Sequence, residues 1–372
     1  MNITFVLAAY NNLNLTQECY KRLRQIYTDA PLVISSGGSS DGTKEWLESL
    51  EDENLSFFHD DDRLTFSQTY NAGIDLVDTE KLVLIHNDMV IGEGFLEAIE
   101  RLLTENMILS YTTIEPPIFK DHVRPGKVIL DLGSDFDDFD DVHFNNYVQQ
   151  FKDKDNLYEG AVFFMSAYKK TFLDLNGFDG LNFFPCFCED DDFLIRAKLK
   201  GYELKTCDSA ISYHFVSQTS RYSEDIKNNR SEIELCSNRN FVRKWGLESS
   251  TFNNIIKYQG IDNFKYNYYR IGLISNHKNV LTTLEPFVDK IRTDEIPEDY
   301  ILDLQPTTRF DLKSKFENND DVDVVLSYGE VLTMDDLNII RKIRMDLPKY
   351  EIGTHEIGNW TVEIKKHNYQ DV

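Results

Sequence analysis

The sequence has few cysteines and no long apolar run. Its five cysteines are odd in number and scattered, which is typical of reduced thiols in a cytosol rather than of a disulfide framework. No stretch approaches the roughly 18 apolar residues of a membrane span. The opening residues MNITFVLAAYNN lack a basic leader, and their apolar run is too short for a signal peptide. We therefore expect a cytoplasmic protein with no membrane span.

Basic residues are also scarce. The chain has 39 lysines and arginines against 64 aspartates and glutamates, which gives a formal net charge of -25. Such a charge repels phosphate backbones and anionic lipids, so an extended nucleic-acid or membrane surface is disfavoured. It leaves room for a local basic patch, and a nucleotide-sized ligand can bind with the help of a cation. We therefore expect small-molecule partners, with nucleic acid disfavoured but not excluded.

The apolar content predicts a folded protein of more than one domain. Hydrophobic residues make up 41% of the 372 residues, and aromatic residues make up 13%, enough to bury a sizeable core. A chain of this length accommodates one domain of about 250 residues and a smaller unit, because a single core seldom grows larger.

Strand and helix patterns alternate along the first hundred residues. Apolar runs at residues 3–9, 32–35 and 82–85 are typical of buried strands, and segments with helical spacing lie between them. Repeated β-α units predict a mixed, mostly parallel sheet flanked by helices, which is an α/β fold. Ligands of such sheets bind beyond the carboxyl ends of the strands, because the loops converge there.

The pattern changes toward the C-terminus. Strands are predicted at residues 270–274 and 322–326, with a helix capped by Thr333 and a hairpin that turns at Gly358 and Asn359. We expect a large domain over residues 1–220, a helical extension over 221–261 and a small α/β domain over 262–372. No phosphate-binding loop or nucleophile pattern assigns a role to the last domain.

Acidic side chains and one imidazole stand at predicted strand ends. Asp88 follows LVLIHN, the acidic run occupies residues 189–192, and His214 follows AISY. An aspartate oxygen and a histidine nitrogen suit a Mg²⁺ or Mn²⁺ ion that also takes diphosphate oxygens, while a further carboxylate can act as a base. Taken singly, each of these features has a structural explanation. The acidic run can complement the dipole of the helix that follows it, Asp88 can be a helix-cap or turn residue, and a lone histidine at a strand end is more often structural than a ligand.

Six stretches in a fixed order weigh against these separate explanations. Together they resemble the inverting family 2 glycosyltransferases with the GT-A fold, and they cover roughly 215 residues. The most specific is the GFD stretch followed by the Glu189-Asp190 pair, with Asp192, Arg196 and Gly201 after it. The stretches are FVLAAYNN, VISSGGSSDGTKEWL, YNAGI, LVLIHNDMVIGEGFLEAI, GFDGLNFFPCFCEDDDFLIRAKLKGY and YHFVSQTS.

The resemblance implies a role for each matching residue. Asp190 is the expected catalytic base with Glu189 as its acidic neighbour, and Asp88 and His214 are the expected ligands of Mn²⁺ or Mg²⁺. A nucleoside-diphosphate sugar is the implied donor and a glycan-like molecule the implied acceptor. The expected acceptor residues are Phe187, Asp191 and Asp192. The expected donor residues are Ala9, Tyr10, Asn11, Ser36, Asp41, Asn71, Gly73 and Asn87.

One departure from the family leaves the donor base open. Ser36 and Gly37 stand where family members usually carry an aspartate that contacts the nucleobase, and the acidic loop at residues 60–62 is an alternative source of that contact. The alternatives are a catalytically silent nucleotide- or glycan-binding protein on the same scaffold and a glycosyltransferase acting on hydroxylated DNA bases. A nucleotidyltransferase fits less well, because SSGGSSDGT has no basic residue before Lys44.

Overall fold

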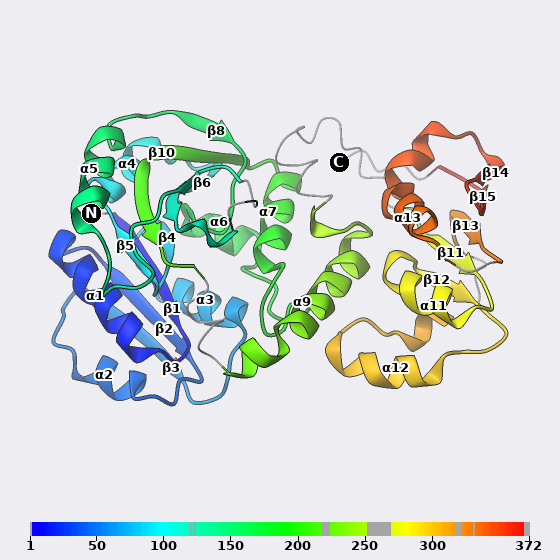
Figure 1. Ribbon diagram of the computed structural model, residues 1–372, viewed down its shortest axis with the longest axis horizontal. Helices are drawn as coiled ribbons and strands as arrows, with labels where there is room; N and C mark the ends of the chain where they lie inside the picture. Colours follow the sequence, from blue (N-terminus) through cyan, green and yellow to red (C-terminus); the bar gives the residue numbers. More distant parts are fainter. Residues whose placement is uncertain are drawn as a thin grey trace. The chain divides into compact units, whose positions relative to one another are not determined.

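The computed structural model describes residues 2–119, 121, 124–216, 224–250, 269–316, 321–329 and 332–367. The chain forms two compact units, one of Met1–Gly180 with Pro185–Ile233 and the other of Leu181–Phe184 with Glu234–Val372 (Figure 1). Both boundaries of the expected helical extension, at residues 220 and 261, lie outside the described residues and stay predictions. Helix α9 (Glu224–Trp245) contributes residues to both units.

The first unit is built on one mixed sheet of ten strands, in the order β3-β2-β1-β4-β9-β6-β10-β5, with β7 beside β6 and β8 beside β10. Strands β1 to β4 pair in parallel, as do β6, β7 and β10, while β5, β8 and β9 run antiparallel to their neighbours. The predicted mixed, mostly parallel sheet is therefore confirmed. Its strands are β1 (Ile3–Ala9), β2 (Leu32–Gly37), β3 (Leu55–Asp60), β4 (Lys81–His86), β5 (Met89–Ile91), β6 (Met107–Glu115), β7 (Lys127–Ile129), β8 (Leu157–Glu159), β9 (Met165–Tyr168) and β10 (Glu203–His214).

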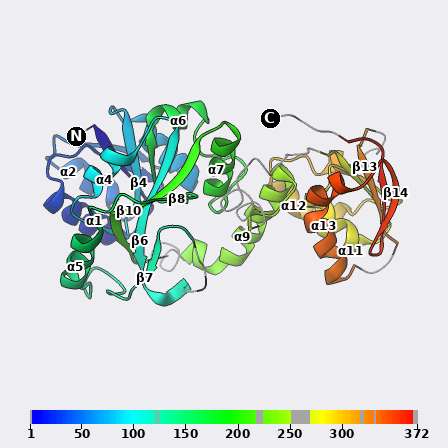
Figure 2. The ribbon, with the colours of Figure 1, turned by 90° about the horizontal axis from the view of Figure 1, so that it is seen from above.

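Helices flank this sheet (Figures 1 and 2). Helix α3 packs on β1 and β2, while α4, α5 and α7 pack on β10. Strands β1 and β4 are buried almost throughout, as their continuous apolar sequences require. The helices are α1 (Leu13–Ile26), α2 (Thr43–Ser49), α3 (Phe66–Asp75), α4 (Phe95–Leu102), α5 (Asp141–Phe151), α6 (Lys169–Asp174) and α7 (Glu189–Leu199), with a 3₁₀ turn η1 (Pro117–Phe119).

The second unit has its own five-stranded sheet, in the order β12-β11-β13-β15-β14. The predicted strands near residues 270 and 322, the helix capped by Thr333 and the hairpin at Gly358 and Asn359 are all confirmed. Its elements are β11 (Ile271–Ile274), α11 (Lys278–Leu284), η3 (Glu285–Phe287), β12 (Lys290–Arg292), α12 (Glu298–Leu304), η4 (Gln305–Thr307), η5 (Lys313–Phe316), β13 (Val324–Ser327), α13 (Met334–Asp346), η6 (Leu347–Lys349), β14 (Gly353–Ile357) and β15 (Trp360–Ile364).

A buried ion cluster joins the helical parts of this second unit. Glu285 is fully buried and accepts hydrogen bonds from Arg243, whose Nη2 lies 2.7 Å from Glu285 Oε2, and from Lys315 at 2.9 Å. Burial alone would raise the pKa of Glu285, but Lys315 and Arg243 outweigh it and hold the pKa well below its usual range. The cluster is fully paired, so we assign it a structural role.

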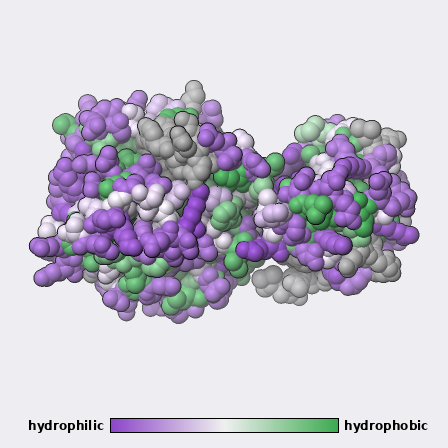
Figure 3. Space-filling view, turned by 90° about the horizontal axis from the view of Figure 1, so that it is seen from below, coloured by the Kyte–Doolittle hydropathy of each residue, from purple (hydrophilic) through white to green (hydrophobic). Residues whose placement is uncertain are grey.

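The surface agrees with the composition. On the face drawn in Figure 3 most side chains of the first unit are hydrophilic. Among the helices that the structure describes, none is both long and apolar enough to cross a membrane.

Candidate active site

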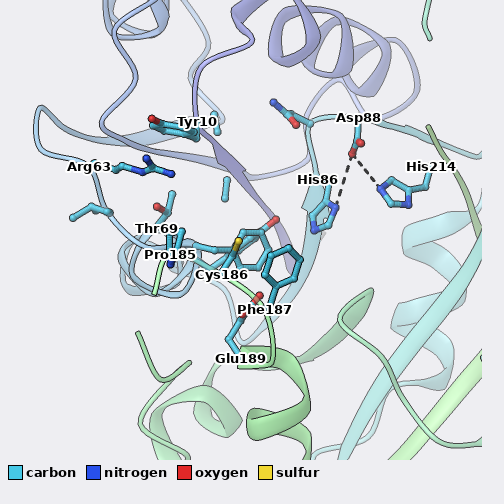
Figure 4. A pocket seen from close by; sticks show the side chains of 16 residues that line it. Tyr10, Arg63, Thr69, His86, Asp88, Pro185, Cys186, Phe187, Glu189 and His214 are labelled. Carbon is cyan, nitrogen blue, oxygen red and sulfur yellow. Dashed lines mark ion pairs between the residues drawn. The ribbon is translucent and has the colours of Figure 1, made fainter. Parts of the chain in front are cut away.

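A cavity of about 300 Å³ opens beyond the carboxyl ends of β1 and β4 (Figure 4). The N-terminal end of α7 borders it, as does α3. This is the edge at which parallel α/β sheets bind ligands, because loops and helix N-termini meet there. The lining residues are Ala8, Ala9, Tyr10, Arg63, Leu64, Phe66, Thr69, Tyr70, His86, Asn87, Asp88, Pro185, Cys186, Phe187, Glu189 and His214.

Three side chains with metal-binding atoms meet on one side of this cavity. His86 ends β4, Asp88 lies in the turn after it and His214 ends β10. Asp88 Oδ1 lies 3.3 Å from His214 Nε2 and 3.9 Å from His86 Nδ1. One ligand atom from each residue lies within 4.8 Å of the others. The structure therefore brings together the two expected metal ligands, Asp88 and His214, and adds His86 to them.

A second layer of charges orients His214. Its Nδ1 lies 3.3 Å from Glu115 Oε1, and Glu115 pairs in turn with Arg124 and with Lys127, whose Nζ lies 3.2 Å from Oε2. Burial alone would lower the pKa of His214, but the carboxylates of Asp88 and Glu115 outweigh it and raise the pKa to about 9. A carboxylate behind an imidazole is the arrangement that fixes ring orientation in metal sites.

His86 is held by aromatic rings rather than by charges. Its ring centroid lies 4.8 Å from that of Phe163 and 5.2 Å from that of Phe164. Burial is the main reason that its pKa falls to about 4, so the ring is neutral at neutral pH. Its Nε2 is buried and has no hydrogen-bond partner. The other ring nitrogen, Nδ1, faces the Asp88 carboxylate, and an imidazole nitrogen beside a carboxylate and a second imidazole fits a divalent cation.

The acidic run divides among several environments. Glu189 lines the cavity and is only 6% exposed, and its Oε2 is buried without a hydrogen-bond partner. Burial, followed by the charge of Asp190, raises the pKa of Glu189 well above its usual value. Asp190 and Asp191 are half-buried and do not line the cavity. Asp192 is fully buried, and its Oδ2 accepts a hydrogen bond from Arg196 Nε at 2.9 Å.

The backbone before α7 is strained where it enters the cavity. Phe187 has φ +80° and Cys188 has φ +69°, two consecutive non-glycine residues in the left-handed region. Each such residue costs about 1 to 2 kcal/mol. This backbone conformation places the ring of Phe187, an expected acceptor residue, among the cavity-lining side chains.

Some of the expected donor residues line this cavity and others do not. Ala9, Tyr10 and Asn87 lie in it, and Asn87 Nδ2 also donates to Thr16 Oγ1 at 3.1 Å. Asn11 and Asp41 instead line a neighbouring hollow of about 620 Å³. Asp41 accepts hydrogen bonds there from the Leu13 and Thr43 backbone amides, and Asn11 accepts one from the Ser40 amide.

Three further expected donor residues have packing roles in the structure. Ser36 is buried and donates to Ser39 Oγ at 2.9 Å. Asn71 clamps the loop before α7, because its amide donates to Phe178 O at 2.8 Å and accepts from Phe178 N at 2.9 Å. Gly73 faces β1 and β2, where a Cβ would lie 2.9 Å from Val6 Cγ1. None of the three is among the residues that line the cavity.

A cationic group that the sequence did not predict lies at the other end of the cavity. The Arg63 guanidinium carbon lies 4.7 Å from the centroid of the Tyr10 ring, and both side chains line the cavity (Figure 4). Gly38 allows this approach, since a Cβ on it would lie 2.5 Å from Arg63 Cα. In the sequence Arg63 follows three aspartates, so it resembles one more charge of a solvated loop. His86 was missed because only Asp88 and His214 were expected as metal ligands.

Residues 4–172 match the protein family described as Glycosyl transferase family 2. No curated protein matches the chain. Among solved structures, the chain is similar to the mannosyltransferase PcManGT from Pyrobaculum calidifontis in complex with GDP-Man and Mn²⁺, at 15% identity and TM-score 0.45, over 71% of this chain and 70% of that one. It is also similar to S. aureus TarS 1-349, at 11% identity and TM-score 0.45, over 99% of this chain and 98% of that one.

Proposed function

We propose that the chain, whose residues 4–172 match the family described as Glycosyl transferase family 2, transfers a sugar from a nucleoside-diphosphate donor to a hydroxyl of a glycan-like acceptor, with inversion at the anomeric carbon. The observation that carries this proposal is that Asp88 and His214 meet at one wall of the cavity, while Glu189 of the acidic run lies at another wall. These residues are far apart in the sequence, and the fold unites them.

Asp88 and His214 would hold a divalent cation. Both are nearly buried, and the Glu115 carboxylate supports the imidazole from behind. When bound there, such a cation neutralises the charge that grows on a departing diphosphate.

The other end of the cavity suits the nucleoside part of the donor. Tyr10 offers an aromatic face, and Arg63 adds a positive charge in a chain that is strongly acidic overall. Stacking on an aromatic ring accepts any base, since every base has a π face. This arrangement is consistent with the lack of a base-contacting aspartate at Ser36 and Gly37.

Asp190, next in the chain to the cavity-lining Glu189, is the proposed catalytic base. In an inverting transfer a carboxylate removes the proton of the acceptor hydroxyl as the oxygen attacks the anomeric carbon from the side opposite the diphosphate. Glu189 has a raised pKa, which favours its protonated, neutral form. As a neutral acid it donates a hydrogen bond to a sugar oxygen.

A thermal-shift panel of nucleotide sugars tests the proposal. A donor present at about 100 times its Kd stabilises the protein by about 2.7 kcal/mol, which a melting curve detects. We expect one group of nucleotide sugars to stabilise the chain with Mn²⁺ and to lose most of that effect when EDTA is added. If no nucleotide sugar shifts the melting temperature with metal present, the proposal is wrong.

A further inference from the structure

The motif that ends β4 reads His86-Asn87-Asp88, with an imidazole at its first position. Asp88 lies in the turn that follows β4, and this turn brings its carboxylate to the His86 ring. His86 Nδ1 and Asp88 Oδ1 are 3.9 Å apart, while the Asn87 amide donates to Thr16 Oγ1. Figure 4 shows the His86 and His214 rings both facing the Asp88 carboxylate, with a dashed line from Asp88 to each ring.

From this geometry we infer that His86 is the third protein ligand of the metal, and that the site therefore selects Mn²⁺ or another first-row transition ion over Mg²⁺. The inference deepens the proposed function and rests on it. Mg²⁺ prefers oxygen ligands, whereas imidazole suits transition metals. Two imidazoles and one carboxylate form a nitrogen-rich set, so a site completed by His86 discriminates where an all-oxygen site does not.

Two further observations support a ligand role for His86 over a packing role. Its ring is fixed by Phe163 and Phe164, and its centroid lies 5.4 Å from that of His214. A histidine that served only to fill this aromatic space would carry two polar nitrogens at a cost, because a phenylalanine fills it without them.

The test counts nitrogen ligands on bound Mn²⁺ in the full-length chain without any nucleotide. Pulsed electron paramagnetic resonance resolves the coupling of each imidazole nitrogen to the ion. We expect two imidazoles in the wild type and one in His86→Phe, which keeps the ring packing and removes both nitrogens. The control is His143→Ala, which changes an exposed histidine of α5 and leaves two. A single imidazole in the wild type, or two in His86→Phe, would overturn the inference.

A competition experiment tests the selectivity directly. In the wild type, Mg²⁺ should displace half of the bound Mn²⁺ only at an excess of about thirtyfold or more, and His86→Asp, which supplies a carboxylate, should lower that excess about tenfold. An unchanged excess in His86→Asp would contradict the role of His86. A wild type that releases nucleoside diphosphate from a donor but shows one imidazole refutes only this inference, whereas absence of release from every donor refutes the proposed function.

Discussion

His214 is held between two carboxylates, with Nε2 3.3 Å from Asp88 Oδ1 and Nδ1 3.3 Å from Glu115 Oε1. The first carboxylate belongs to the turn after β4 and the second to the end of β6, so three separated strands fix one imidazole. Glu115 lies behind the ring as seen from Asp88. Because Glu115 and Asp88 contact different nitrogens of His214, the orienting role of Glu115 can be measured separately from the ligand role of Asp88.

Replacing Glu115 with Gln should weaken Mn²⁺ binding by about 10- to 100-fold, because an outer carboxylate orients the imidazole and increases its basicity. The measurement is Mn²⁺ affinity by calorimetry. Glu159→Gln is the matched control, since Glu159 is exposed and pairs with Lys205 on the surface. Equal affinities of the two variants would show that Glu115 does not support the ligand.

Replacing Asp190 with Asn should lower turnover about 100-fold or more and leave donor affinity nearly unchanged, because the amide keeps the shape and cannot accept the proton. Steady-state kinetics and donor titration separate the two effects. Asp153→Asn, which changes an exposed aspartate that does not line the cavity, serves as the control and should retain most activity. Full turnover in Asp190→Asn would end its assignment as the base.

Replacing Asp192 with Asn should destabilise the first unit by about 3 kcal/mol, since it leaves Arg196 without its buried carboxylate partner. Arg196 also donates to Gly177 O at 2.8 Å, so the pair fixes the loop before α7. Urea denaturation measures the change. A stability equal to that of the wild type, with acceptor binding lost, would restore the expected acceptor role of Asp192.

The stability contribution of Glu189 should depend on pH. Its pKa in the folded protein is raised above the ordinary value of 4.5, so the side chain is protonated in both states below pH 4.5. As the pH rises from there, the unfolded chain releases the proton while the folded protein keeps it, and stability falls until the folded pKa is passed. Glu189→Gln lacks this loss, so its stability relative to the wild type should rise as the pH increases above 4.5. Urea denaturation measures the stability of both proteins at each pH. A stability difference between Glu189→Gln and the wild type that does not change with pH would contradict this prediction.

Cysteine labelling should report on the cavity. Cys186 lines it and is half-buried, whereas burial raises the pKa of Cys19 to about 12 and that of Cys207 to about 11. Peptide mapping after brief alkylation should find Cys186 modified well before Cys19 and Cys207, and a bound donor should slow the reaction of Cys186. Cys236 does not line the cavity and is the internal control, so slowing at both sites alike would argue against a donor in this cavity.

The sequence predicted the sheet because its signals are local. The apolar runs of β1 and β4 and the repeat of β-α units require no knowledge of distant contacts, and the Thr333 cap is read from neighbouring residues. The pairing of Asp88 with His214 followed from the family resemblance and not from spacing. It depends on β4 and β10 ending at one edge, which the order of strands in the sheet decides.

Residues whose role depends on side-chain direction could not be assigned from the sequence. Asn71 and Asp192 match the family pattern, yet each is used to hold the loop before α7. Arg63 approaches Tyr10 only because two loops from different strands touch at Gly38. A pattern of residue types carries no information about such contacts, since these depend on how the loops pack.

The most direct test of the proposed chemistry is nucleoside-diphosphate release from the best-binding nucleotide sugar, measured with Mn²⁺ for the wild type and for Asp88→Asn. We predict release that requires the metal, stops on addition of EDTA and falls about 100-fold or more in Asp88→Asn, which keeps the side-chain shape but loses a charged ligand. Release at the same rate in EDTA, or in Asp88→Asn, would contradict the metal-dependent transfer described above.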